Sequence, residues 1–469
     1  MSRSRSTWSN ASFSGWAMPD LELAIRGGTA VLPDGPARVD VGVADGQIVA
    51  VAPELTGAAG ELDATGLHVL PGGVDPHVHF DEPGRTDWEG VASGTRALAA
   101  GGFTTYVDMP LNNIPATVDG PSFDAKLAAV SASSLVDFGL WGGLVPGNVD
   151  RLEELHERGT CGFKAFMCHS GIDEFQGVDD LTLVEGMQRI AELGSILLLH
   201  AENAAIVGGL GARFRERGRL APRDFAASRP PAAEHEALAR AIRFAGETGC
   251  ATHIVHVSTA RGVTLVAEAA ARGVDVTCET CPHYLLFTED ELEEIGLPLK
   301  SAPPVRSAAD RDGLWRLVAA GELAMVTSDH SPGAPEVKRG DFFAAWGGIS
   351  GCQSTLQLLL EAGHVLRGLP LETIASLTAS AAARRFGLAG KGEVAPGFDA
   401  DLTVVDLRWT GTVELGDLHY RHRMSAYAGQ PIRGRIARTL LRGRTVYADG
   451  DFDPEPRGRL VRTRFNTKP

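Results

Sequence analysis

The chain has 469 residues, 44% of them hydrophobic, so it can bury a large core and exceeds what one ordinary domain usually holds. Its 44 lysines and arginines against 59 aspartates and glutamates give a net charge of −15, and no long basic run is present, which argues against nucleic acid as a partner. No apolar stretch approaches the roughly 20 residues that a membrane span needs. We therefore expect one large domain with an accessory domain, and small molecules or further copies of the chain as partners.

The cysteines and residues 1–18 indicate in which cellular compartment the protein is expected. All six cysteines lie mid-chain, mostly inside apolar runs, which differs from the layout of a secreted disulfide scaffold. Residues 1–18 are rich in serine and contain no acidic residue, as transit segments do, but they lack the apolar core of a secretion signal. We expect a disordered tail at 1–18 and a reduced, cytoplasmic setting.

Short alternating strands are predicted near both ends of the chain. Residues 21–53 alternate apolar and polar side chains around an Asp-Gly turn at 45–46, and a similar pattern returns at 401–405 and 439–447. Neither segment has enough strands to bury a face alone. We expect the two to fold together as a small β-sandwich, built from residues 19–70 and from residues 391–469.

Between them, residues 71–390 contain short, nearly non-alternating apolar runs, as expected of strands buried on both faces of a parallel sheet. Ala-rich stretches with helical spacing, such as 88–100 and 182–193, separate most of these runs. Eight strand-helix units predict an α/β fold, a (β/α)₈ TIM barrel, although periodicity alone is also compatible with a doubly wound sheet. The strands are expected at 73–77, 104–109, 136–142, 162–167, 196–200, 253–257, 274–278 and 324–328.

Side chains that could bind metal lie at the ends of several predicted strands. His77 and His79 have period-two spacing, which puts both imidazoles on the same side of an extended segment. Taken alone, this pair is more often two polar residues at a strand end than a metal site. Barrel active sites form at the carboxyl ends of the strands, so further candidates at equivalent positions strengthen the metal hypothesis. Those candidates are Lys164, His200, His256 and Asp329.

Lys164 lies in the apolar segment 162–167, where an isolated ammonium is costly. Its head could simply pair with a carboxylate or reach water. Alternatively, burial and neighbouring cations lower its pKa, so that a neutral amine can be carboxylated by CO₂. A carboxylated lysine would supply one oxygen to each of two metal ions.

Asp329 can be both a metal ligand and the group that shuttles a proton from an attacking water to the leaving nitrogen. His330 is expected to act only through supporting hydrogen bonds. The Cys-x-x-Cys pair at 278–281 is discounted as a redox or zinc site, because no partner pair follows it. The loop 331–348 is interpreted either as a lid or as a cover of the barrel rim.

Seven segments of the chain resemble the amidohydrolase superfamily, and within it the cyclic amidases: dihydroorotase, hydantoinase, dihydropyrimidinase and allantoinase. The resemblance covers roughly residues 21–447 and implies a barrel flanked by a small β-sandwich, in a homotetramer or dimer. It also implies two divalent metal ions, zinc or alternatively iron, cobalt or manganese, bridged by carboxylated Lys164. The segments are PGGVDPHVH at 71–79, GFK at 162–164, LHAEN at 199–203, HIVHVS at 253–258, TCPHY at 280–284, APPVR at 302–306 and SDH at 328–330.

Within this group, residues 82–90 followed by 108–112 are similar to the allantoinases, which implies hydrolysis of allantoin to allantoate. Asp81 stands where dihydroorotases carry an arginine for the substrate carboxylate, and an anion there would repel that substrate; allantoinases are expected to have asparagine. His169 stands where hydantoinases carry a tyrosine that stabilises the oxyanion, so it is either an equivalent hydrogen-bond donor or a surface histidine. By the same resemblance, the substrate contacts are Asn112, Ser301, Ala302 and Gly348.

Three other functions remain open from the sequence. One is a hydantoinase or dihydropyrimidinase of broader specificity, and another is a hydrolase of the same superfamily for an unrelated amide or ester. The third is a metal-free homologue that serves as a scaffold. Because such a homologue would be expected to have lost ligands, the presence of all six candidate metal ligands disfavours the scaffold.

Overall fold

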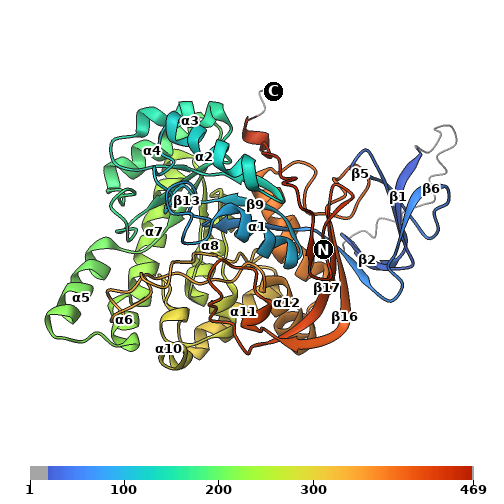
Figure 1. The fold of residues 1–469 in the computed structure, drawn as a ribbon. Coiled ribbons are helices and arrows are strands. Elements are labelled where there is room, and N and C mark those ends of the chain that lie inside the picture. The colour runs from blue at the N-terminus through green and yellow to red at the C-terminus, as the bar shows by residue number, and fades with distance from the viewer. Residues whose placement is uncertain (1–19, 467–469) are drawn as a thin grey trace.

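The computed structural model describes residues 20–466, and the tail predicted at 1–18 lies outside them. Figure 1 shows a barrel surrounded by helices and, at one end, twisted β-sheets in which N-terminal and C-terminal strands lie close together. All six cysteines are free and buried. Between residues 20 and 466, no helix is long and apolar enough to cross a membrane.

Parallel strands form the barrel, as the short apolar runs predict. The third predicted strand is interrupted at Trp141 into β10 and β11, which pair with β9 and β12 respectively. The other strands follow in chain order around the ring. The barrel strands are β8 (Gly73–Val78), β9 (Phe103–Asp108), β10 (Asp137–Leu140), β11 (Gly142–Gly143), β12 (Phe163–Phe166), β13 (Ile196–His200), β14 (Ala251–Ile254) and β15 (Val276–Cys278).

The eighth predicted strand, at 324–328, is not a continuous strand. Two isolated parallel bridges close the ring there instead, one from Val326 to Thr280 and one from His330 to Val78. Between them the backbone of Asp329 has a φ of 43°, in the left-handed region, which cannot continue an extended ladder. The prediction was therefore right about the position of this segment and wrong about its conformation, because within residues 324–328 only Val326 forms a bridge.

Helices pack around the barrel, and several begin at residues whose side chains cap the free backbone N–H groups. Asp179 accepts from Thr182 N at the start of α4, and Thr259 accepts from Gly262 N at the start of α8. The helices are α1 (Val91–Ala100), α2 (Gly120–Ser133), α3 (Leu152–Arg158), α4 (Asp180–Glu192), α5 (Ala204–Glu216), α6 (Pro222–Ser228), α7 (Pro231–Thr248), α8 (Ala260–Ala271), α9 (Pro282–Leu286), α10 (Glu289–Ile295), α11 (Ala308–Ala320), α12 (Thr355–Leu359), α13 (Leu371–Ala375) and α14 (Ala381–Phe386).

Two sheets form from the terminal segments. One has the order β5-β4-β1-β6 and comes from the N-terminal segment alone, and the other, β19-β18-β17-β16-β7-β2-β3, combines both ends of the chain. A buried apolar cluster that includes Ile25 and Val41 from the first sheet and Val69 and Leu402 from the second joins the two. The strands are β1 (Leu21–Arg26), β2 (Thr29–Leu32), β3 (Gly35–Arg38), β4 (Asp40–Ala44), β5 (Gln47–Ala52), β6 (Ala58–Asp63), β7 (His68–Pro71), β16 (Leu402–Thr412), β17 (Pro431–Leu441), β18 (Arg444–Ala448) and β19 (Asp451–Phe452).

A buried lysine ties the terminal sheets to the barrel. Lys391 Nζ lies 2.6 Å from a carboxylate oxygen of Asp137 on β10, 2.9 Å from Asp399 and 2.7 Å from Asp401. We call these four residues the Lys391 clasp. The C-terminal segment also returns to the barrel, where Leu460 forms a parallel bridge with Phe138.

Candidate metal centre

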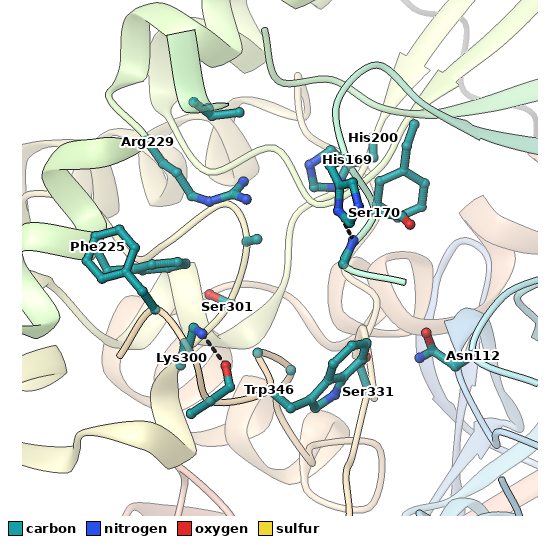
Figure 2. Close-up of a pocket in the computed structure, with 18 of the residues that line it drawn as sticks. Asn112, His169, Ser170, His200, Phe225, Arg229, Lys300, Ser301, Ser331 and Trp346 are labelled. Atoms are coloured by element: carbon teal, nitrogen blue, oxygen red, sulfur yellow. Dashed lines mark hydrogen bonds between the residues drawn. The ribbon is translucent and has the colours of Figure 1, made fainter. Parts of the chain in front are cut away.

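A cavity of about 810 Å³ lies at the carboxyl ends of the barrel strands (Figure 2). This volume is within the roughly 300–1,000 Å³ range of small-molecule sites. Most of the site residues that the sequence predicts line this cavity, and they come from segments spread between β8 and the loop 331–348. They are His77, His79, Asn112, His169, His200, His256, Ser301, Ala302, Asp329 and Gly348.

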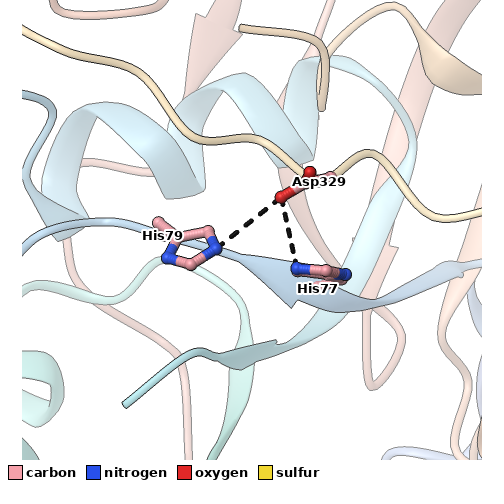
Figure 3. A group of neighbouring side chains, drawn as sticks. All are labelled: His77, His79 and Asp329. Atoms are coloured by element: carbon pink, nitrogen blue, oxygen red, sulfur yellow. Dashed lines mark ion pairs between the residues drawn. The ribbon is translucent and has the colours of Figure 1, made fainter. Parts of the chain in front are cut away.

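His77, His79 and Asp329 form one cluster (Figure 3). A carboxylate oxygen of Asp329 lies 3.2 Å from His77 Nε2 and 3.6 Å from His79 Nε2. Burial alone would raise the pKa of Asp329, but the two neighbouring imidazoles outweigh it and lower the pKa to about 2. The carboxylate is therefore ionised at neutral pH and can serve as a ligand.

His200 and His256 form a second cluster beside the first. His200 Nδ1 lies 3.1 Å from His256 Nε2, and the ring of His256 lies 5.4 Å from that of His77. Burial lowers the pKa of His200, and burial together with His200 and Lys164 lowers that of His256 well below its usual value. Both rings are therefore neutral at pH 7, which is the form that binds metals.

Lys164 lies on β12, fully buried next to these histidines. Its Nζ has no hydrogen-bond partner within residues 20–466 and lies 4.6 Å from the centre of the Phe166 ring, which itself stacks on His200. Burial lowers the pKa of Lys164 to about 7, although Asp329 and Glu279 act in the opposite direction. A buried amine without a partner is costly, so this position fits a lysine that a further group completes.

Two buried glutamates hold the histidines, and neither was predicted from the sequence. Glu279 accepts from His77 Nδ1 at 2.5 Å and from His253 Nε2 at 3.1 Å. Burial would raise the pKa of Glu279, but the two histidines lower it below its usual range. Such carboxylates fix the tautomer and orientation of metal-binding imidazoles. Glu279 lies inside the Cys-x-x-Cys segment at 278–281, where the sequence pattern drew attention to the cysteines alone.

Glu202 plays the corresponding part for His200. Its carboxylate lies 2.8 Å from His200 Nε2 and also pairs with Arg229. Burial would raise its pKa, but Arg229 and His200 lower it to about 2. Glu202 belongs to the LHAEN segment at 199–203. Its position two residues after His200 was the feature of the sequence from which its role could have been predicted.

Asp81 differs from the expectation drawn for it. Asp81 is buried and is not one of the described residues that line the cavity. Its carboxylate is therefore not placed to repel a substrate. Burial and the nearby Asp108 and Glu89 raise its pKa well above the usual value, which favours the neutral acid. Repulsion by Asp81 therefore does not disfavour a carboxylate-bearing substrate.

His169 and His330 lie around the centre rather than within it. His169 is at the cavity rim with 70% of its side chain exposed, and its Nδ1 accepts from Gly171 N. Its role as an oxyanion donor stays a prediction. His330 is buried, accepts from Gly351 N, and its backbone oxygen accepts from His79 N, so its supporting role agrees with the expectation.

The loop 331–348 covers part of the cavity. Trp346 packs on Trp88 with 4.8 Å between ring centroids, and Lys338 donates to the Gly348 carbonyl. Gly348 N donates to the carbonyl of Lys300. These contacts hold the loop against the rim; whether it opens as a lid stays a prediction.

Comparison with known proteins agrees with this geometry. The sequence model described as the amidohydrolase family matches residues 68–446. An allantoinase of Rubrobacter xylanophilus is 57% identical over 95% of this chain and 98% of its own, and one of Solibacter usitatus is 50% identical over 95% and 98%. Among solved structures, the L-hydantoinase (dihydropyrimidinase) of Arthrobacter aurescens superposes with a TM-score of 0.92 at 33% identity, over 95% of this chain and all of the other.

Proposed function

The chain belongs to the amidohydrolase family, and we infer from that premise that it is a cyclic amide hydrolase that opens the hydantoin ring of allantoin to give allantoate. The observation that carries this inference is the meeting of two histidine clusters and Asp329 at one cavity, with an unpartnered buried lysine behind them. The same activity is named for relatives that match nearly the whole chain.

We propose that two divalent cations bind here, with zinc favoured over iron, cobalt or manganese, and that Lys164 carries a carboxylate derived from CO₂. The proposed ligands present imidazole nitrogens and carboxylate oxygens, which suit all of these metals. When bound, the cations polarise the ring carbonyl and make a water molecule acidic enough to attack near neutral pH. The ligands are His77, His79, Lys164, His200, His256 and Asp329.

Asp329 is the proposed proton carrier. It is ionised at neutral pH, so it can take a proton from the attacking water and deliver it to the ring nitrogen as the C–N bond breaks. Glu279 and Glu202 keep His77 and His200 in place from behind. Asp329 acts on charge that develops in the transition state, where stabilisation accelerates the reaction.

Neutral hydrogen-bonding groups are proposed to hold the uncharged substrate. The side-chain oxygen of Asn112 is buried and has no hydrogen-bond partner within residues 20–466. Gly348 N–H already donates to the Lys300 carbonyl, and the Gly348 carbonyl accepts from Lys338. The second lone pair of the Gly348 carbonyl is therefore the hydrogen-bonding capacity that remains. Ser301, Ala302 and His169 complete the proposed contacts, with His169 as a candidate donor to the oxyanion.

We also propose a domain organisation, a cellular compartment and an assembly for this chain. The two terminal sheets are proposed to pack as a β-sandwich beside the barrel, with the latter spanning residues 71–390. The unpaired, buried cysteines support a reduced, cytoplasmic setting. A homotetramer or dimer is the expected assembly.

The test is a rate comparison on allantoin, hydantoin and dihydrouracil, with metal content measured on the same preparation. We expect allantoin to have the highest kcat/KM and close to two metal ions per chain. If allantoin were the poorest of the three, the alternative hydantoinase function, which the similarity to the Arthrobacter structure favours, would replace our proposal. Absence of metal after gentle purification, together with absence of turnover, would instead favour a scaffold.

A further inference from the structure

The cavity is larger than allantoin requires, and the part away from the histidines has its own chemistry. We call this part the outer chamber and define it by Arg215, Phe225, Arg229, Lys300 and Phe343, all of which line the cavity. In Figure 2, Phe225, Arg229 and Lys300 lie on one side of the cavity, whereas His169, His200 and Asn112 lie on the other. The outer chamber is therefore open to the substituent of a ring held at the histidines.

The outer chamber is cationic, and two of its charges have no carboxylate partner. Arg229 is paired with Glu202. Within residues 20–466, neither Lys300 nor Arg215 forms an ion pair; Lys300 Nζ donates to the carbonyl of Ala345, and the Arg215 guanidinium lies 5.4 Å from the Phe343 ring centre. The chamber therefore offers positive charge that is not neutralised at close range.

The cations are crowded around aromatic rings. Lys300 Nζ lies 4.8 Å and the Arg229 guanidinium carbon 5.5 Å from the centre of the Phe225 ring. Burial and the charges of Arg229 and Arg215 lower the pKa of Lys300 to about 8, with Asp341 acting in the opposite direction. An anion entering the chamber would relieve this repulsion and gain charge-assisted hydrogen bonds.

We propose that the outer chamber is a subsite for an anionic substituent, so that the enzyme also hydrolyses hydantoins whose C5 side chain ends in a carboxylate. This inference rests on the proposed function, because it uses the same reacting centre. One water is consumed: its oxygen forms the new bond to the ring carbonyl carbon, the ring C–N bond breaks, and the ring nitrogen takes up a proton. The product is an N-carbamoyl amino acid with two carboxylates.

The experiment compares each acid with its neutral amide, which has nearly the same shape. The probes are hydantoin-5-acetic acid and hydantoin-5-propionic acid, each against its side-chain amide, and the readout is the acid-to-amide ratio of kcat/KM. For at least one chain length we expect a ratio of about ten or more, the usual effect of a hydrogen bond to a charged group. Because the ratio is internal to each variant, a general loss of activity does not affect it.

Variants locate the effect. Lys300→Met should bring the ratio close to one, Lys300→Arg should retain most of it, and Arg215→Met, at an exposed position, should lower it by a smaller factor. Arg339→Met is the matched control: Arg339 also lines the cavity, but it is paired with Glu336 at 3.8 Å, so the ratio should not change.

A wild-type ratio of one or less for both chain lengths would overturn the proposal, as would a ratio that survives in the Lys300→Met and Arg215→Met variants. Allantoin turnover is measured on the same samples. If allantoin is hydrolysed and the acids show no advantage, the outer-chamber inference alone fails. If the acids are preferred and allantoin is not hydrolysed, the proposed function alone fails.

Discussion

Two buried lysines in this molecule have opposite surroundings. In the clasp, Lys391 has three carboxylates within 2.9 Å, and their charges outweigh burial and raise its pKa. In the metal centre, Lys164 has no hydrogen-bond partner among residues 20–466, and burial lowers its pKa to about 7. Burial alone therefore does not make a lysine reactive. The number of carboxylates in contact decides whether the amine stays a structural cation or becomes available for chemistry.

The largest effect is expected from removing the reactive lysine. Lys164→Ala should lose bound metal and reduce kcat/KM by at least about a thousandfold, because metal polarisation is worth several kcal/mol in the transition state. Metal analysis and steady-state kinetics measure both losses. Added short-chain carboxylic acids should restore part of the activity. Unchanged activity would show that Lys164 does not bridge the metals.

Asp329→Asn should keep the fold and lower turnover by about 10²–10⁴-fold, because it removes the proton carrier and one ligand. The loss should persist at every pH from 6 to 9, since asparagine cannot titrate. Circular dichroism checks the fold while kcat is measured across that range. A variant with a normal rate would refute the proton-carrier assignment.

Glu279→Gln tests the support behind His77. It should weaken metal affinity by about 10–100-fold, the usual cost of losing a carboxylate that orients a metal-binding histidine. Glu234→Gln is the matched control, since Glu234 is also buried but accepts from Ser258 and Thr259 rather than from a histidine. Competition with a chelator measures the affinity, and equal losses in the two variants would exclude a specific role for Glu279.

The low pKa of Lys164 predicts how activation depends on pH. Burial lowers it from 10.5 to about 7, so the amine is mostly neutral above pH 7 and mostly charged below. Metal-free enzyme supplied with CO₂ and zinc should regain activity with a rate that falls by up to about tenfold for each pH unit below 7. A rate that rises tenfold per unit up to pH 10 would instead indicate an unshifted lysine.

The clasp should affect stability and leave chemistry alone. Lys391→Met leaves Asp399 and Asp401 without an ion pair, whereas Asp137 keeps its pair with Arg442. The variant should lower the free energy of unfolding by about 3–5 kcal/mol, as breaking buried ion pairs does. Urea denaturation measures this loss. At temperatures where the variant stays folded, its kcat should equal that of the wild type. A selective loss of kcat would mean that the two lysines are not as different as the structure indicates.

Much of the barrel could be predicted from the sequence, because the apolar spacing of a strand depends on residues that are adjacent in the chain. Apolar runs of five to seven residues mark the first seven predicted strands, and the Asp-Gly turn at 45–46 is found with both residues at positive φ. The eighth predicted strand, at 324–328, was not found as a strand. This part of the chain forms only isolated bridges at Val326 and His330, with the left-handed residue Asp329 between them. Hydrophobic spacing carries no information about a left-handed φ at a single polar residue.

The order of residues along the chain was enough to predict which side chains stand at the strand ends, and hence that imidazoles, a lysine and a carboxylate would meet at one mouth of the barrel. Only the tertiary structure decided what surrounds them: Glu279 behind His77, the absence of a partner for Lys164 within the described chain, and the uncompensated charge of Lys300. The reason is physical. Strand periodicity is set by adjacent residues, whereas the electrostatic free energy of a buried group is summed over residues hundreds of positions apart that only folding brings into contact.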